Sequence, residues 1–312
     1  MKKIVFLIIT SAALLIGPSV FALESLKMAS GHYLAYETYQ GAGPEAATLV
    51  LLPGINRALD QRDQVIKQMS KQKKFNFISY HSGLHPESLL LIPRTEAAFF
   101  KQQNVTLKDL AREAITLIKK LKIKNPVFVS LSYSSAISTE LSKLMKTAFI
   151  IEVAPMIRFD ESDPQGSQTL SFWKTWLDLF PLGSAWSDTF MKQAYSQYWS
   201  SRVDEMLVDS EDKSQRGIMI QAYSQLSLAI EGFDYRQQDF SKTAKRYYLF
   251  AENEDPDRAD LQQQALVENN QQTGLQATSF VISDSGHVIP TEQPQQYINT
   301  LRKILKTEGL IN

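Results

Sequence analysis

The sequence lacks cysteine entirely, so none of its 312 residues can form a disulfide. It also lacks an excess of charge, because 33 Lys and Arg balance 33 Asp and Glu. Such a balance argues against nucleic acid and against an anionic membrane surface as partners. No internal repeat and no low-complexity segment appears. With 44% hydrophobic residues, the chain is long enough for one large domain or one domain with an insertion.

Metal-ligand clusters and glycine-rich phosphate loops are absent from the sequence too, so we expect no metal and no cofactor. Long apolar runs are scarce. The run from Ile4 to Gly17 is shorter than the roughly 18 to 20 residues that a membrane-spanning helix needs. It follows Lys2-Lys3 and precedes Val20-Phe21-Ala22, an order that predicts a bacterial signal peptide over residues 1–22. We therefore expect a periplasmic or secreted protein with no stable membrane span; the alternative is an uncleaved anchor.

The rest of the chain alternates between two hydrophobic periodicities. Short apolar runs predict strands, and apolar residues three and four positions apart predict helices. Strands are expected at 48–52, 75–80, 127–131, 148–154, 247–251 and 278–282, after a hairpin at 26–39; helices are expected at 58–69, 107–121, after 135 and around 297–305. This alternation predicts an α/β fold with a mostly parallel central sheet flanked by helices.

The strand pattern stops between Pro155 and Lys245. Aromatic residues are dense in part of this span, with nine among residues 172–199: Phe172, Trp173, Trp176, Phe180, Trp186, Phe190, Tyr195, Tyr198 and Trp199. We interpret residues 155–245 as a helical cap, or lid, inserted over the carboxyl ends of the strands, where such sheets bind ligands. The aromatic residues are expected to form mostly the core of this lid, and a few of them to line an apolar pocket.

The most informative stretch runs from Asn125 to Leu141. A buried strand turns into a helix there through the small residues of Ser130-Leu131-Ser132-Tyr133-Ser134. This context is typical of a nucleophile elbow, which holds a serine hydroxyl at the top of a sheet. The usual pattern is G-x-S-x-G, however, and serine replaces both glycines here. On its own the turn could equally be a serine-rich connection without chemistry.

A serine nucleophile needs a base, and the sequence offers four histidines: His32 in the hairpin, His81 and His85 after an early strand, and His287 after the last strand. His287 lies in a Gly-His turn between the last strand and the last helix, at the expected carboxyl edge of the sheet. We therefore predict that His287 is the base. The other three are more simply structural or loop residues.

The base in turn needs an orienting acid, which we expect beyond the penultimate strand. The segment Glu252-Asn253-Glu254-Asp255-Pro256 follows that strand. Asp255 is the preferred candidate, because Asp suits a turn before proline and its short side chain holds an imidazole rigidly. Glu254 and Glu252 are the alternatives, and a merely solvated acidic loop is also possible.

With Ser132, an acid and His287 in this order, the chain resembles the α/β-hydrolase family over nearly its whole length. The resemblance rests on Gly31–Tyr36, Leu51–Gly54, the elbow and the ending Gly286-His287…Glu292-x-Pro294. It implies a core of residues 23–154 and 246–312, with residues 155–245 as the cap.

The same resemblance implies a catalytic triad of Ser132 as nucleophile, His287 as general base and acid, and Asp255 as its orienter. The oxyanion hole would be the backbone N–H groups of Ile55 and Tyr133. The chain departs from the family pattern at Ser130 and Ser134, and at Pro53-Gly54, where relatives have His-Gly.

The function expected from this resemblance is that of a serine hydrolase, similar to carboxylesterases and lipases. It would cleave a small apolar ester through an acyl-enzyme. Two alternatives stay open: a peptidase or amidase that uses the same triad, and a non-catalytic binding protein that keeps only the pocket. An aspartate nucleophile is excluded, because position 132 is serine.

Overall fold

The structure is a computed structural model. It describes residues 24–29, 31–43, 45–52, 54, 68, 76–84, 88, 105–159, 225–226, 228–238, 245–254, 256–274 and 277–311. The expected signal peptide and the aromatic segment at 172–199 lie outside these residues, as does the helix expected at 58–69 apart from residue 68. No helix within the described part of the chain is long and apolar enough to cross a membrane.

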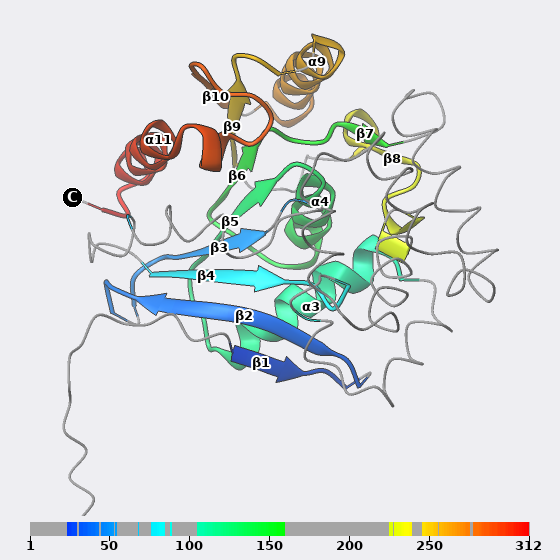
Figure 1. Cartoon of the computed structure of the whole chain (residues 1–312), viewed down its shortest axis with the longest axis vertical. Helices are drawn as coiled ribbons and strands as arrows, with labels where there is room; N and C mark the ends of the chain where they lie inside the picture. The colour runs from blue at the N-terminus through cyan, green and yellow to red at the C-terminus, as the bar shows by residue number, and fades with distance from the viewer. Residues whose placement is uncertain are drawn as a thin grey trace, which may run out of the picture.

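Within the described residues, eight strands form one central sheet in the order β1-β2-β4-β3-β5-β6-β9-β10 (Figure 1). Strand β2 is antiparallel to β1 and β4, and the other neighbouring strands are parallel. The strands are β1 (Glu24–Lys27), β2 (Tyr33–Gln40), β3 (Thr48–Leu52), β4 (Asn76–His81), β5 (Pro126–Leu131), β6 (Phe149–Val153), β9 (Lys245–Ala251) and β10 (Thr278–Ile282). The carboxyl ends of β3, β5, β6, β9 and β10 therefore meet at one edge of the sheet.

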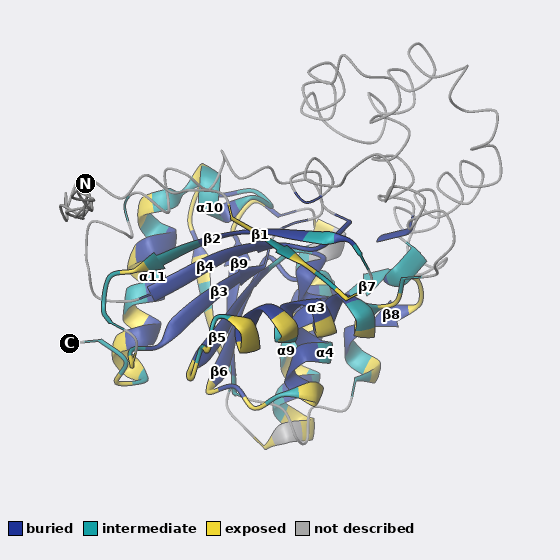
Figure 2. Cartoon of the chain, turned by 90° about the horizontal axis from the view of Figure 1, so that it is seen from below, coloured by how far each residue is buried: buried dark blue, intermediate teal, exposed yellow. Residues whose placement is uncertain are grey.

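Helices cover both faces of this sheet (Figure 1). They are α3 (Leu107–Lys120), α4 (Ser134–Leu144), α9 (Pro256–Thr273), α10 (Ile289–Glu292) and α11 (Pro294–Thr307). Side chains of a strand alternate between its two faces. In β5, Phe128 packs with α3 and α4, whereas Val129 packs on the other face, in the same cluster as α11. The inner strands β3, β4, β5, β6 and β9 are accordingly buried on both faces, whereas most residues of the edge strands β1 and β10 are exposed. The helices expose their outer sides (Figure 2).

Helix α3 illustrates how local sequence sets an element. Its apolar residues recur on one face, and Leu110, Ala114 and Ile118 are buried there. Thr106 and Asp109 form the expected capping box, in which each side chain accepts from the other residue's backbone N–H. Leaving these N–H groups unsatisfied costs helix stability, so the helix begins where the sequence predicts.

The expected strands and helices that fall on described residues are present, with ends that differ by at most three residues. Two differences are larger. Strands β7 (Arg158–Phe159) and β8 (Phe233–Asp234) pair with each other at the two ends of the 155–245 span, where we expected no strand. Helix α9 was not predicted, because its apolar residues are few and weakly periodic. The domain limits of the expected cap stay a prediction.

Candidate active site

Ser132 occupies the turn between β5 and α4 with a backbone φ of +56°. A residue with a Cβ atom rarely adopts this left-handed backbone conformation, which costs roughly 1 to 2 kcal/mol and persists only where the surroundings enforce it. Here the Ser132 N–H donates to the Val153 carbonyl at 3.0 Å, and the Ser132 carbonyl accepts from Met156 N–H at 3.1 Å. The end of β6 thus holds both backbone groups of Ser132.

His287 reaches this serine from the loop between β10 and α10. Its Nε2 lies 2.8 Å from the Ser132 Oγ, although the two residues are 155 positions apart in the sequence. The carboxylate of Glu292 accepts hydrogen bonds from the N–H groups of Gly286, at 2.5 Å, and Val288, at 3.1 Å. These are the two residues on either side of His287, so Glu292 fixes the backbone that carries the imidazole.

Glu254, which follows β9, is the carboxylate that contacts His287. Its Oε2 lies 2.7 Å from His287 Nδ1, and its side chain is only 2% exposed against 29% for the imidazole. The sequence favoured Asp255 for this position and gave Glu254 as an alternative. In the structure the alternative, Glu254, is the carboxylate that contacts His287; Asp255 itself lies outside the described residues.

The turn that carries Glu254 is tied to the loop that carries His287. Asn253 N–H donates to the Ser285 carbonyl at 2.8 Å, and Asp284 N–H donates to the Glu252 carboxylate at 2.8 Å. Glu252 was the second alternative acid, and it serves here as a link between the two loops. These bonds hold the acid and the histidine as one unit opposite the serine.

At the level of sequence, the chain matches no protein-family model and no curated protein. Among solved structures it is similar to a carboxylesterase from Nitrososphaera gargenis, at 15% identity and a TM-score of 0.63, over 91% of this chain and 98% of that one. It is also similar to the carboxylesterase CesB of Bacillus subtilis, at 16% identity, a TM-score of 0.61 and 92% of both chains.

A third similar structure is the enol-lactonase of Burkholderia xenovorans LB400, at 15% identity and a TM-score of 0.61, over 91% of this chain and all of that one. The chain has the α/β-hydrolase fold. The order of the strands, the strained turn after β5 and the loops after β9 and β10 are the parts of this fold that bring the three side chains together.

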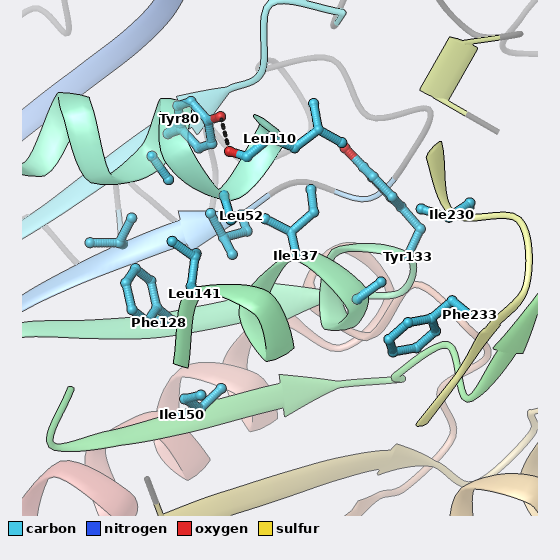
Figure 3. Close-up of a cluster of buried hydrophobic side chains, with 14 of the residues drawn as sticks. Leu52, Tyr80, Leu110, Phe128, Tyr133, Ile137, Leu141, Ile150, Ile230 and Phe233 are labelled. Atoms are coloured by element: carbon cyan, nitrogen blue, oxygen red, sulfur yellow. Dashed lines mark hydrogen bonds between the residues drawn. The ribbon is translucent and has the colours of Figure 1, made fainter. Parts of the chain in front are cut away.

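The structure describes one of the two residues expected to donate to the oxyanion. Tyr133 directly precedes α4 and is 2% exposed, within the hydrophobic cluster that holds Ile137, Ile230 and Phe233 (Figure 3). This packing fixes the residue whose backbone N–H stands beside Ser132. The second expected donor, Ile55, lies outside the described residues. Its neighbour Gly54 is buried just beyond β3, the strand next to β5.

The two elbow serines that replace glycine in this α/β-hydrolase fold are both fully buried. Ser130 is paired in register with Glu152 of β6, and its hydroxyl donates to the Glu152 carboxylate. Glu152 also forms an ion pair with Arg246 of β9. The sequence analysis missed both charged residues. A carboxylate within the otherwise apolar strand β6 was the signal that could have found Glu152, whereas Arg246 lies beside Lys245 at the start of β9, before the expected strand.

The remaining histidines are distributed as follows. His32 Nε2 contacts the Glu113 carboxylate at 2.5 Å, and His81 is fully buried at the end of β4. Neither is bonded to Ser132 in the contacts that the structure describes, and His85 lies outside the described residues. Among those residues, no group of three or more His, Cys, Asp and Glu side chains could hold a metal ion.

Proposed function

We propose that the protein is a serine hydrolase that cleaves a carboxylic ester through an acyl-enzyme on Ser132. The observation that carries this proposal is the chain of contacts from Ser132 Oγ to His287 Nε2, at 2.8 Å, and from His287 Nδ1 to Glu254, at 2.7 Å. A nucleophile, a base and an orienting acid joined in this way form the arrangement that activates a serine hydroxyl.

In the acylation step, Ser132 Oγ attacks the ester carbonyl while His287 Nε2 takes its proton. The Nδ1–H of His287 donates to Glu254, which fixes the tautomer and stabilises the imidazolium. The backbone N–H groups of Tyr133 and Ile55 would bind the oxyanion, and each such donor contributes about 3 to 4 kcal/mol to the transition state. The C–O bond then breaks, and His287 returns its proton to the leaving alkoxide.

In the deacylation step, water takes the place of the departed alcohol. His287 removes a proton from the water as it attacks the acyl carbonyl, and the same imidazole then protonates Ser132 Oγ as the acid product leaves. No cofactor enters this cycle. The partly exposed imidazole, at 29%, suits a group that must exchange protons with substrate and water.

An ester substrate is favoured over an amide because the similar structures include two named carboxylesterases and one enol-lactonase. The aromatic residues between Phe172 and Trp199 support an apolar acyl pocket as part of the same proposal. Each buried CH₂ of an acyl chain would then add up to about 0.8 kcal/mol of binding. The alternatives are a peptidase or amidase with the same triad and a binding protein without activity.

The decisive test is labelling of residues 23–312 with a fluorophosphonate, followed by mass-spectrometric location of the adduct. We expect the adduct on Ser132, no labelling of Ser132→Ala, and continued labelling of Ser134→Ala. Rates on p-nitrophenyl esters from acetyl to octanoyl, compared with the matching anilides, then separate esterase from amidase. A wild-type protein that neither labels nor hydrolyses any of them would leave the binding protein as the better reading.

Export to the periplasm or beyond the cell is part of the proposal and rests on residues 1–22 alone. N-terminal sequencing of the protein from the cell envelope fraction is expected to begin at Leu23. An intact Met1 on membrane-bound protein would instead indicate an uncleaved anchor.

A further inference from the structure

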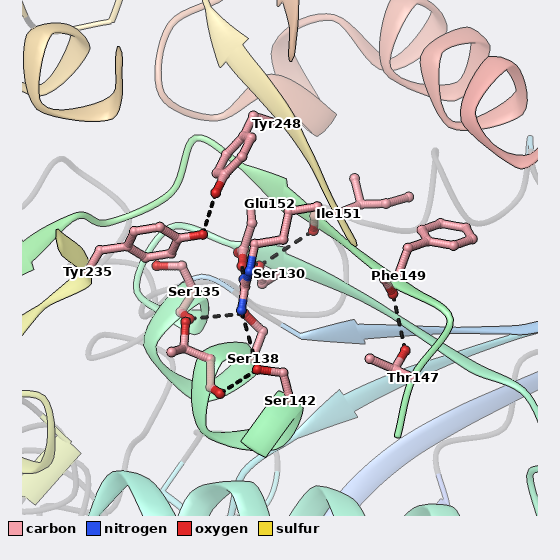
Figure 4. A network of polar contacts seen from close by, with 12 residues as sticks. Ser130, Ser135, Ser138, Ser142, Thr147, Phe149, Ile151, Glu152, Tyr235 and Tyr248 are labelled. Atoms are coloured by element: carbon pink, nitrogen blue, oxygen red, sulfur yellow. Dashed lines mark hydrogen bonds and ion pairs between the residues drawn. The ribbon is translucent and has the colours of Figure 1, made fainter. Parts of the chain in front are cut away.

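Glu152 touches both elements that meet at the nucleophile. Its Oε2 accepts from the hydroxyl of Ser130, in the strand that enters the Ser132 turn. Its Oε1 accepts from the hydroxyl of Ser138 at 3.0 Å, in the helix that leaves this turn. One carboxylate thus ties β5 to α4, and Figure 4 shows it together with these two serines.

This carboxylate is held in place by a buried cation. Glu152 is 0% exposed and Arg246 is 1% exposed, and the two form an ion pair across β6 and β9. Burial raises the pKa of the Glu152 carboxyl above its ordinary value, and Arg246 and the two serine hydroxyls oppose that shift. A buried charge is costly unless its lone pairs are satisfied, so each of these donors matters to the pair.

The turn between the two serines is the strained part of the active site. Ser132 has a φ of +56°. This strained backbone conformation would relax if β5 and α4 were free to move apart. The backbone bonds to Val153 and Met156 restrain Ser132 itself. The bonds to Glu152 restrain the two arms, at Ser130 two residues before the turn and at Ser138 six residues after it.

We propose that Ser130 and Ser138 are positioning residues for the nucleophile: through the Glu152 carboxylate they fix strand β5 relative to helix α4 and so keep Ser132 Oγ aligned with His287. This inference rests on the proposed function, because it assigns these residues a role in the same reaction. It also accounts for serine at position 130, where a glycine would leave one oxygen of a buried carboxylate without its hydroxyl donor.

The test compares four single variants of residues 23–312: Ser130→Ala, Ser138→Ala, Ser142→Ala and the rescue variant Ser130→Thr. Ser130→Ala and Ser138→Ala each remove one hydroxyl from Glu152. Ser142→Ala is the matched control, because Ser142 lies on the same helix and accepts from Arg246 at 3.3 Å, but makes no bond to Glu152. The measurements are the rate constant of fluorophosphonate labelling, kcat and KM on a p-nitrophenyl ester, and the melting temperature.

We expect kcat and the labelling rate to fall about 3- to 10-fold in Ser130→Ala and Ser138→Ala, with KM within about twofold. Ser130→Thr, which restores the hydroxyl in a strand that suits β-branched residues, is expected to recover most of the rate. Ser142→Ala is expected to keep the wild-type kcat, whatever its melting temperature.

Equal labelling rates in all folded variants would overturn the inference, since the serines would then contribute only to stability. Equal losses in Ser142→Ala would overturn it as well, because the effect would not depend on contact with Glu152. A reactive wild-type protein with unaffected variants overturns this inference alone. A wild-type protein that neither labels nor hydrolyses esters overturns it together with the proposed function.

Discussion

The described part of the molecule contains two histidine–glutamate pairs with similar distances between imidazole and carboxylate. His287 Nδ1 lies 2.7 Å from Glu254, and His32 Nε2 lies 2.5 Å from Glu113. The imidazole of His287 is 29% exposed, whereas that of His32 is only 8% exposed. A short distance between an imidazole and a carboxylate therefore does not by itself identify a catalytic site.

The partners of each pair make the difference. The second ring nitrogen of His287 faces the hydroxyl of Ser132 at 2.8 Å. The second oxygen of Glu113 instead accepts from Tyr80 and from the Gly83 N–H, each at 3.1 Å. The His32 pair thus joins the β1–β2 connection, α3 and the loop after β4. Position 83 favours glycine, because the Cβ of any other residue would lie 2.3 Å from the His32 imidazole. One pair faces a serine hydroxyl, and the other ties three segments of the chain together.

The largest expected loss of kcat follows from removing Ser132 or the imidazole of His287 that faces it. Ser132→Ala and His287→Ala should each lower kcat by about 10⁴- to 10⁶-fold, since either change removes a partner in the proton transfer. The melting temperature should stay close to that of the wild type, as measured by calorimetry. Residual turnover above about 1% in either variant would contradict the triad.

The next effect separates the two neighbouring acids. Glu254→Ala should lower kcat by about 10²- to 10⁴-fold, because His287 then loses the group that fixes its tautomer. Asp255→Ala is the matched control and should change kcat by less than about threefold. The reverse result in steady-state kinetics would restore Asp255, the residue that the sequence favoured.

A smaller effect is expected at Glu292. Glu292→Ala removes both bonds to the backbone around His287 and should lower kcat about 10-fold. Glu292→Gln keeps one acceptor oxygen and should fall between Ala and wild type.

Gln296→Ala is the matched control for Glu292, because Gln296 bonds the same loop at Ser283, four residues before His287. It should leave kcat within about twofold of the wild type. Equal kcat values for all three variants would show that Glu292 only caps the short helix α10.

The smallest effect on activity is expected at the other pair. Glu113→Gln should leave kcat/KM per folded molecule within about twofold. It should lower the free energy of unfolding by about 1 to 3 kcal/mol, because a buried carboxylate with three partners is replaced. Urea denaturation measures this cost. A loss of activity comparable to that of Glu254→Ala would mean that the two pairs are coupled.

Much of the fold could be predicted from local patterns. The apolar runs placed β3 and β10 at their observed residues, and the capping box placed the start of α3. The meeting of Ser132 and His287 could be predicted as well, because each follows a clear strand, and strand ends of a parallel sheet meet at one edge.

The rest depends on contacts that no local pattern contains. Three carboxylates lie within four residues after β9, and the direction of the turn decides that Glu254 faces His287. The ion pair between Glu152 and Arg246 spans 94 positions and exists only because β6 pairs with β9. Without it, Ser130 looks like a departure from the glycine pattern rather than part of a buried network.

The separation of the site residues along the chain has a consequence for biosynthesis. Ser132 and its turn are translated more than a hundred residues before β10 and the loop with His287, since 155 positions separate the two side chains. A nascent or truncated chain that ends before β10 carries the nucleophile without its base. The proposed hydrolase is thus chemically silent until strand β10 and the loop with His287 have been made and docked, so an incomplete chain cannot attack esters.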